Sequence, residues 1–279
     1  MYEAYYGLRA RPFSILPDPG FLYFGRKHKV ALDLLEYGLS QGAGFCVVTG
    51  PIGTGKTTLI RYLLGNAGQG AEVGLIANMH ALAGSLLPRV LFAFGLDVQA
   101  AADLERLQTF SRYLESLAAE GRRAVLIVDE AQCLSAPMLE ELRMLSNVDV
   151  DAAVLQVVLA GQPGLKELLC RPELEQLAQR VVVDYELLPL DRRETAQYIA
   201  HRLRVAGADG PSMFEEEACD AVHGYSRGVP RLINVLCETA LVYGFGDQKP
   251  RIDAQVIHDV AGDRRRTGIF PLRGSAQAV

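Results

Sequence analysis

Apolar residues along the chain form two patterns, and these alternate over roughly its first two thirds. Continuous apolar runs, typical of buried strands, occur at 45–50 (FCVVTG), 124–130 (AVLIVDE) and 154–162 (VLQVVLAGQ), and 71–78 (AEVGLIAN) is also predicted to be a strand. Apolar positions at helical spacing lie between or before these runs, over 27–41, 58–64, 82–95, 103–120 and 137–147. Strands that are apolar throughout and alternate with helices form a parallel sheet covered on both faces. We therefore predict an α/β domain over residues 1–188, with a further short strand starting at Val181.

The pattern changes after residue 188, where only helical spacing is found. Asp191 and Glu194 form a D-x-x-E helix-start signal. The helical segments that follow are 192–207, 214–226, 229–246 and 253–262. We predict a small all-helical domain over 189–262 and a disordered tail over 263–279.

The N-terminal segment, residues 1–25, is rich in aromatic residues and proline. Because turn-forming residues are so dense there, we predict an ordered loop rather than a helix. The segment lacks the positive start and apolar run of a signal peptide. No apolar stretch approaches the ~18 residues needed to span a bilayer, so we expect any membrane role to come through a partner.

The composition is that of a globular protein, with 49% apolar and 22% charged residues. The net charge of −5 argues against a generally basic surface for nucleic acid, although it leaves room for a local basic patch. The five cysteines form no C-x-x-C pair, and Cys46, Cys133 and Cys237 lie among aliphatic residues. We expect these three thiols to be small core hydrophobes in a reduced, cytoplasmic protein.

The segment GPIGTGKT fits the phosphate-binding pattern G-x-x-x-x-G-K-[ST] and lies between a predicted strand and a predicted helix. Glycines let backbone N–H groups approach phosphate oxygens, and the helix start adds positive potential. Lys56 is expected to reach the outer phosphates, and the Thr57 hydroxyl to bind Mg²⁺. The alternative is a plain glycine turn between strand and helix. The residues predicted to bind ATP here are Gly50, Pro51, Gly53, Thr54, Gly55, Lys56, Thr57 and Thr58.

Two acidic residues and one amide follow the ends of two later strands. Asp129 and Glu130 end AVLIVDE, and Gln162 ends VLQVVLAGQ. Ligands of such sheets bind at the carboxyl ends of the strands. We expect Asp129 to hold Mg²⁺, Glu130 to act as the general base and Gln162 to orient the attacking water. The alternatives are a solvated acidic pair and a turn residue before Pro163.

Three arginines are candidates for contacts with phosphate. Arg180, just before the short strand, could complete the site of a neighbouring subunit, with Arg171 as the second choice. Arg231, in GVPRLIN, could contact the phosphates of its own subunit. The alternative for each is a solvent-facing arginine. None of the histidines (His28, His80, His201, His223 and His258) has ligand spacing, so we expect surface or capping roles rather than metal binding.

In this order, the motifs resemble those of AAA+ ATPases. A closer resemblance, to ExeA/GspA-type secretion ATPases, rests on MYEAYYGLRARPF, PDPGFLYFGRKHKVALDLLEYGL, LEELRMLSN, LAGQPGL, LAQRVVV and GVPRLINVLC. Within that group the chain looks most similar to the ATPases that accompany exosortase (PEP-CTERM) and exopolysaccharide loci. The resemblance covers about residues 1–262.

The resemblance implies a P-loop AAA+ core, with a parallel sheet between helices, followed by a helical lid domain. It implies that ATP and Mg²⁺ are bound, that Gln162 is the first sensor, Arg180 the finger arginine and Arg231 the second sensor. It also suggests that Tyr23 or Phe24 lines the adenine pocket. A finger arginine further implies a homo-oligomeric ring stimulated by nucleotide.

The function that we expect from this resemblance is ATP hydrolysis that drives assembly of a secretion or exopolysaccharide-export system, with inner-membrane proteins as partners. Full-length ExeA-like proteins add a membrane helix and a peptidoglycan-binding domain, which this sequence lacks; we therefore expect the shorter, soluble type. One alternative is an ATP-dependent DNA-binding regulator of the transposition type, suggested by the basic run Arg264–Arg266. Another is a nucleotide switch without turnover, against which Glu130 argues. The DEAQ segment also resembles a helicase signature, but we find no second helicase domain.

Overall fold

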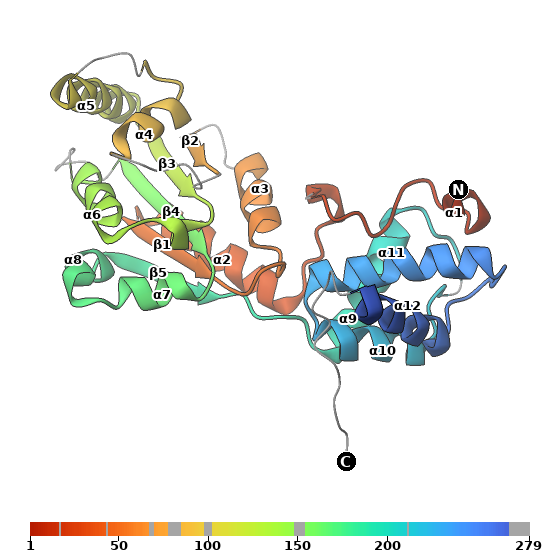
Figure 1. The fold of residues 1–279 in the computed structure, drawn as a ribbon. Helices are drawn as coiled ribbons and strands as arrows, with labels where there is room; N and C mark the ends of the chain where they lie inside the picture. The colour runs from red at the N-terminus through yellow and green to blue at the C-terminus, as the bar shows by residue number, and fades with distance from the viewer. Residues whose placement is uncertain are drawn as a thin grey trace. The chain divides into compact units, whose positions relative to one another are not determined.

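A computed structural model of the chain describes residues 1–16, 18–42, 44–66, 70–77, 85–97, 102–147, 154–210 and 212–267 (Figure 1). The chain divides into two compact units. The sheet unit comprises Lys29–Ile52 and Leu59–Leu187, and the helical unit comprises Met1–His28, Gly53–Thr58 and Leu188–Val279. The N-terminal segment, which the sequence analysis assigned to the α/β domain, therefore groups with the C-terminal helices.

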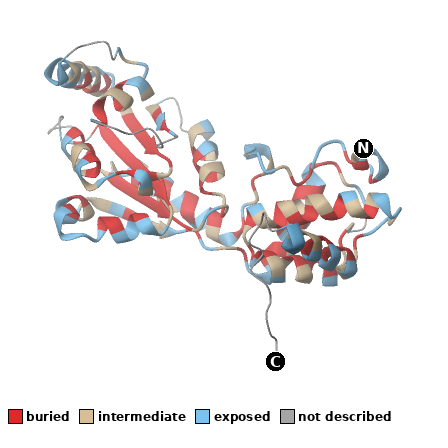
Figure 2. Ribbon diagram, viewed as in Figure 1, coloured by how far each residue is buried: buried red, intermediate tan, exposed pale blue. Residues whose placement is uncertain are grey.

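A five-stranded parallel sheet forms the centre of the sheet unit, which confirms the predicted fold class. Its strands lie in the order β2-β3-β4-β1-β5. Both β1 and β4 are buried at every position, as expected of strands covered on both faces (Figure 2). The bounds are β1 (Phe45–Thr49), β2 (Ala71–Ile76), β3 (Arg123–Val128), β4 (Leu155–Gly161) and β5 (Val181–Glu186).

Helices pack against both faces of this sheet. Alternate residues of each strand point to opposite faces, so Cys46 and Val48 face one cluster and Phe45 and Val47 face the other. The first cluster includes residues of α2 (Arg26–Ser40) and α3 (Lys56–Asn66). The second includes residues of α4 (Leu87–Ala93), α5 (Asp103–Ala119), α6 (Ala136–Leu145), α7 (Gly164–Leu169) and α8 (Glu175–Ala178). Of the helix predicted over 82–95, residues 82–84 lie outside the described part.

The helical unit is built from four longer helices around one apolar core. The predicted helix start at Asp191 is confirmed: Asp191 accepts a hydrogen bond from the N–H of Glu194, and the Glu194 side chain accepts one from the N–H of Asp191. The helices are α9 (Arg192–Val205), α10 (Glu216–Ser226), α11 (Pro230–Gly246) and α12 (Ala254–Thr267).

The N-terminal segment contains more structure than the predicted loop. Helix α1 spans Tyr2–Tyr5 and a single 3₁₀ turn spans Pro19–Phe21. Tyr2, Tyr6 and Phe13 are buried in the core formed by α9–α12. The aromatic residues of this segment thus complete the core of the helical unit, a role that explains their density.

The arginine run expected to begin a disordered tail lies instead in the last turn of α12. Arg264 donates a hydrogen bond to the Thr239 hydroxyl at 2.9 Å. The Arg265 guanidinium lies 5.2 Å from the centre of the Tyr225 ring. These contacts arise because helix α12 continues through Thr267, past the predicted boundary at residue 262. The rest of the expected tail, 268–279, lies outside the described residues.

All five cysteines are free thiols. Cys46, Cys219 and Cys237 are buried, whereas Cys133 and Cys170 are exposed. Cys133 was expected in the core; it is exposed because its segment leaves the sheet as a short 3₁₀ turn after β3. Burial raises the pKa of the Cys46 thiol to about 11, which keeps it protonated. Within the described ranges, no helix is both long and apolar enough to cross a bilayer.

Candidate nucleotide-binding site

The phosphate-binding loop starts at the carboxyl end of β1, beside the end of β4. The N–H of Gly50 donates a hydrogen bond to the carbonyl oxygen of Gly161 at 3.2 Å. Asp129 follows β3, which pairs with β4 on the side opposite to β1. Because parallel strands end at the same edge of the sheet, the loop start, Asp129, Glu130 and Gln162 come together at this edge.

The second half of the loop belongs to the helical unit and depends on two glycines in left-handed conformations. Gly53 has φ +83° and Gly55 has φ +102°. A Cβ on Gly53 would lie 2.6 Å from the Cβ of Arg231, and one on Gly55 would lie 3.1 Å from Nε2 of His28. Both the backbone conformation and the space therefore favour glycine at these positions.

His28 supports the loop, a role that the sequence analysis missed. Its Nε2 lies 3.0 Å from the carbonyl oxygen of Thr54, and since a carbonyl only accepts, Nε2 carries the proton. The residue is 4% exposed, and its burial lowers the pKa of the imidazole. The expected surface or capping role for His28 is therefore wrong. Helical spacing could have revealed this, because His28 shares the buried face of α2 with Ala31, Leu32 and Leu35.

Lys56 begins helix α3 and is 7% exposed. Thr54 is fully buried, and Thr57 and Thr58 are half-buried. The first backbone N–H groups of α3 carry the partial positive charge of a helix N-terminus. An anionic phosphate fits a loop that combines these N–H groups with a buried ammonium. The Thr57 hydroxyl and the Asp129 carboxylate are each oxygen groups of the kind that Mg²⁺ prefers, and a site that they share stays a prediction.

Arg231 lies in the first turn of α11, next to the loop. Its backbone N–H donates a hydrogen bond to the carbonyl oxygen of Gly53 at 3.2 Å, and its side chain is exposed. The turn before α11 is fixed by Gly228, where a Cβ would lie 1.8 Å from the carbonyl oxygen of Leu190. The structure thus places Arg231 beside the phosphate-binding loop, while its contact with phosphate stays a prediction.

Tyr23 packs on helix α9. Its hydroxyl donates a hydrogen bond to Oε1 of Gln197 at 2.8 Å, and its ring lies edge-on to that of Tyr198. Burial raises the pKa of this phenol. Phe24 is exposed. The role predicted for either residue at the adenine base stays a prediction.

The acidic pair is held by contacts of its own backbone. The N–H of Asp129 donates to the carbonyl oxygen of Ile76 at the end of β2, and Asp129 Oδ1 accepts from the N–H of Glu130 at 2.9 Å. Asp129 is 7% exposed. Glu130 has φ +54°, a left-handed conformation that costs a residue with a side chain about 1–3 kcal/mol. Such strain is typical of functional sites, where it fixes the direction of a side chain.

Gln132 links the carboxylate of Glu130 to the end of β4. Its Nε2 donates to Oε2 of Glu130 at 2.5 Å, and its Oε1 accepts from the backbone N–H of Gln162 at 2.8 Å. The side-chain amide of Gln162 lies 3.4 Å from the same Oε2. Two amide groups therefore orient one carboxylate. In the sequence, Gln132 stands out only as part of DEAQ, because its role depends on the neighbouring strand β4.

Arg180 lies at the other edge of the sheet from the acidic pair. It precedes β5, and its guanidinium lies 5.9 Å from the centre of the ring of Phe45, the first residue of β1. Its Nη1 donates to Oγ of Ser146 at 2.9 Å and also to Oδ1 of Asn147. Arg171 is exposed, with Glu173 at 3.8 Å as an ion-pair partner. Neither arginine joins the acidic pair within one subunit.

Comparison with known proteins finds similarity to a family model and to a relative of known name. Residues 39–169 match the family model described as "AAA domain". The chain is 42% identical over 247 residues to general secretion pathway protein A of Aeromonas hydrophila. This similarity covers 88% of the chain and 45% of that protein, so the chain spans less than half of its relative's length.

Solved structures support the AAA P-loop fold. The ORC2 protein of Aeropyrum pernix, in ADPNP–ADP complexes, superimposes with a TM-score of 0.69 at 17% identity, covering 93% of this chain and 72% of that chain. Cdc6p from Pyrobaculum aerophilum gives a TM-score of 0.66 at 15% identity, with 90% and 74% covered. The RuvB branch-migration motor of Thermotoga maritima gives 0.57 at 18% identity, with 90% and 73% covered. At such identities the likeness establishes the fold.

Proposed function

We propose that this chain hydrolyses ATP in the presence of Mg²⁺ and that hydrolysis serves a membrane-linked protein secretion system. The orientation of Glu130 is the observation that supports hydrolysis rather than binding alone. A carboxylate held by two amide groups, at the sheet edge where the phosphate-binding loop starts, is suited to receive a proton from water.

The residues divide the chemistry between them. The loop N–H groups and Lys56 bind the phosphates, and Thr57 and Asp129 hold the Mg²⁺ ion, which neutralises phosphate charge when bound. Glu130 accepts the proton of the attacking water. Gln132 and Gln162 keep the Glu130 carboxylate in one orientation, so that the base needs little rearrangement.

A matched pair of variants tests hydrolysis. Glu130→Gln keeps the shape of the side chain but removes the base, and we expect ATP turnover to fall by about 10²-fold or more while ATP binding persists. Glu105→Gln on α5 makes the same change at an exposed position and is expected to leave turnover unchanged. Wild-type turnover in Glu130→Gln would remove Glu130 from the mechanism and leave a nucleotide switch.

We further propose that the active form is a homo-oligomer in which an arginine of one subunit completes the site of the next. This is supported by the position of the acidic pair, which neither Arg180 nor Arg171 joins within its own subunit. Arg180 remains the candidate from sequence, but it is occupied by contacts with its own chain. Arg171, with 59% of its side chain exposed, is freer to reach a neighbour.

The secretion role is supported by 42% identity to general secretion pathway protein A. The finer assignment, to an exosortase-associated system that exports exopolysaccharide, rests on the sequence resemblance. Affinity purification with the Glu130→Gln variant tests both the secretion role and the finer assignment. This variant is expected to stay bound to ATP, so it should retain partners that bind the ATP state, either inner-membrane secretion proteins or polysaccharide-export proteins. Recovery of the same proteins with Lys56→Ala, which is expected to bind no ATP, would argue against nucleotide-dependent recruitment.

The DNA-binding alternative has less support in the structure. All three arginines that suggested it contact residues of their own helical unit, Arg266 through an ion pair with Asp263. A direct test is binding to duplex DNA with ATP at low salt, where phosphate contacts are strongest. Salt-sensitive binding would revive the alternative, and absence of binding would remove it.

A further inference from the structure

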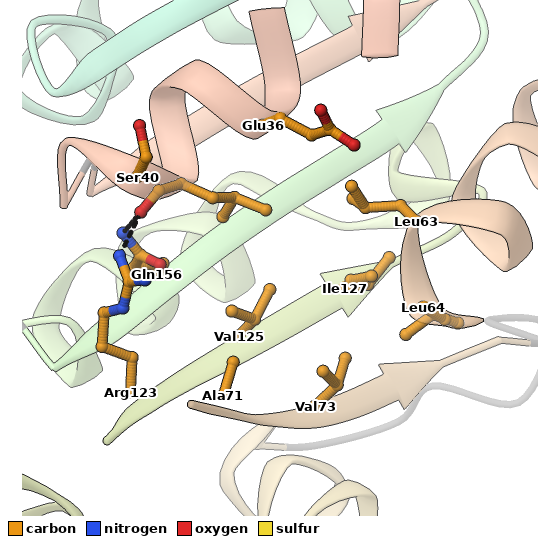
Figure 3. A pocket seen from close by; sticks show the side chains of 11 residues that line it. Glu36, Ser40, Leu63, Leu64, Ala71, Val73, Arg123, Val125, Ile127 and Gln156 are labelled. Atoms are coloured by element: carbon orange, nitrogen blue, oxygen red, sulfur yellow. Dashed lines mark hydrogen bonds between the residues drawn. The ribbon is translucent and has the colours of Figure 1, made fainter. Parts of the chain in front are cut away.

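The sheet unit contains a cavity of about 210 Å³ on the face of β2, β3 and β4 that packs against α2 and α3 (Figure 3). None of the residues assigned to ATP or Mg²⁺ lines it, so the proposed ATPase chemistry does not use it. Val73, Val125 and Ile127 form its apolar floor, and Leu63 and Leu64 of α3 form one wall. Glu36 and Ser40, both exposed residues of α2, complete the lining on the side of that helix.

One of the polar side chains that line this cavity is fully buried. Gln156 is 1% exposed, and its Nε2 donates to the carbonyl oxygen of Leu39 at 2.8 Å. Arg123 donates to the same carbonyl oxygen from Nη1 (Figure 3). Oε1 of Gln156 is buried and accepts no hydrogen bond from any residue in the described ranges. If Oε1 and Nε2 of Gln156 were exchanged, the amide oxygen would face the carbonyl oxygen of Leu39, and neither could donate a hydrogen bond. The Leu39 carbonyl therefore identifies Oε1 as the acceptor without a donor.

A buried acceptor without a donor is costly, and a ligand that donates a hydrogen bond removes that cost. The cavity is larger than an engineered apolar cavity of roughly 150 Å³ that binds benzene. It is smaller than the roughly 300–1,000 Å³ typical of sites for drug-sized ligands. The size therefore favours a ligand of one ring or two fused rings. The apolar floor and wall favour an apolar body, and the free acceptor of Gln156 favours a donor on it.

We propose that this cavity is a binding site for a small, mostly apolar ring compound that carries one N–H or O–H donor. The donor is directed to Oε1 of Gln156, and the ring lies between α3 and strands β2 and β3. A carboxylate oxygen does not fit opposite Oε1 of Gln156, because it would bring a second acceptor to an acceptor and leave both without a donor.

Two isosteric probes test the role of the donor. Indole has the size and N–H that the site requires, whereas benzothiophene has the same shape without a donor. One hydrogen bond is worth about 1 kcal/mol, so we expect indole to bind about fivefold more tightly. Calorimetry and ligand-observed NMR on the full chain measure the two affinities. Equal affinities for indole and benzothiophene would overturn the proposal. No binding of either probe at millimolar concentration would also overturn it, and would indicate that the cavity holds only water.

Two variants locate the binding. Ala71→Leu fills the cavity from β2 and is expected to abolish indole binding, whereas Ala119→Leu adds the same group at an exposed position on α5 and should not. Gln156→Leu removes the acceptor and is expected to erase the preference for indole. Unchanged indole binding in Ala71→Leu would place the ligand elsewhere. Binding is measured without ATP, so failure of this proposal is distinct from failure of the proposed ATPase.

Discussion

The backbone N–H of Arg231 donates a hydrogen bond to the carbonyl oxygen of Gly53, joining the start of α11 to the phosphate-binding loop at 3.2 Å. The contact is close because Gly53 has no side chain: a Cβ there would lie 2.6 Å from that of Arg231. A change in the loop on binding phosphate would therefore act directly on helix α11. This gives Arg231 a backbone role in addition to the predicted contact between its guanidinium and phosphate.

Gly53→Ala should weaken ATP binding without unfolding the chain. Alanine disfavours the left-handed backbone conformation of Gly53, and its Cβ would collide with the Cβ of Arg231. The loop must therefore shift, and its N–H groups no longer point toward the phosphates. We expect ATP affinity to fall about tenfold or more, measured with a fluorescent ATP analogue. Gly65→Ala is the matched control, because Gly65 lies in α3 with open space around it and alanine favours a helix. Equal affinities in the two variants would contradict this account of the loop.

Gln132→Leu should lower turnover while leaving ATP binding nearly intact. The change removes the amide that holds Glu130 and the acceptor for the N–H of Gln162, so the base loses its fixed orientation. We expect kcat to fall about tenfold and KM to change less than about threefold. Gln108→Leu, at an exposed position on α5, is the control for a loss of glutamine. A rise in KM with unchanged kcat would assign Gln132 to binding instead.

Much of the fold follows from local sequence, whereas parts of the site do not. Continuous apolar runs predicted β1, β3 and β4, and the phosphate-loop pattern predicted the turn between β1 and α3. The aliphatic neighbours of Cys133 do not reveal that its segment leaves the sheet as a 3₁₀ turn, and the burial of the N-terminal aromatic residues depends on helices distant in sequence. Gln132 acts only through β4, which pairs beside β3. The burial of His28 could have been predicted, since the helical spacing of α2 places it on the buried face.

The pH dependence of stability should reveal His28. Its folded pKa lies below the ordinary value of 6.5 because the folded protein buries it. Below pH 6.5 the unfolded chain therefore binds a proton that the folded chain excludes, and stability falls as the pH falls. Each such proton contributes a slope of at most about 1.4 kcal/mol per pH unit.

Denaturant unfolding of wild type and His28→Gln between pH 7.5 and 5.5, a range of about one unit either side of that value, measures this contribution. The variant should show a shallower loss of stability, although His201 and His223, whose pKa values burial also lowers, continue to contribute. Parallel stability curves for the two proteins would exclude His28 as a source of the dependence.

An arginine that acts across subunits can be identified by mixing inactive variants. Neither Arg171→Ala nor Glu130→Gln should turn over ATP alone. In a mixture, a subunit with Glu130 can receive Arg171 from its Glu130→Gln neighbour, and about a quarter of randomly assembled interfaces are of this kind. Because Arg171 is exposed and Arg180 is held by Ser146 and Asn147, we expect Arg171→Ala to regain activity on mixing without losing stability.

Arg180→Ala should show the opposite behaviour in the same assay. Loss of its hydrogen bonds and of its contact with Phe45 is expected to destabilise the sheet unit by about 1–3 kcal/mol, and mixing with Glu130→Gln should restore little activity. Thermal unfolding measured beside the ATPase assay separates these effects. The opposite result would be an Arg180→Ala variant that keeps its stability and restores activity when mixed with Glu130→Gln, together with an Arg171→Ala variant that hydrolyses ATP normally by itself. That result would show that the Arg180 side chain completes the site of the neighbouring subunit, as its position in the sequence predicts.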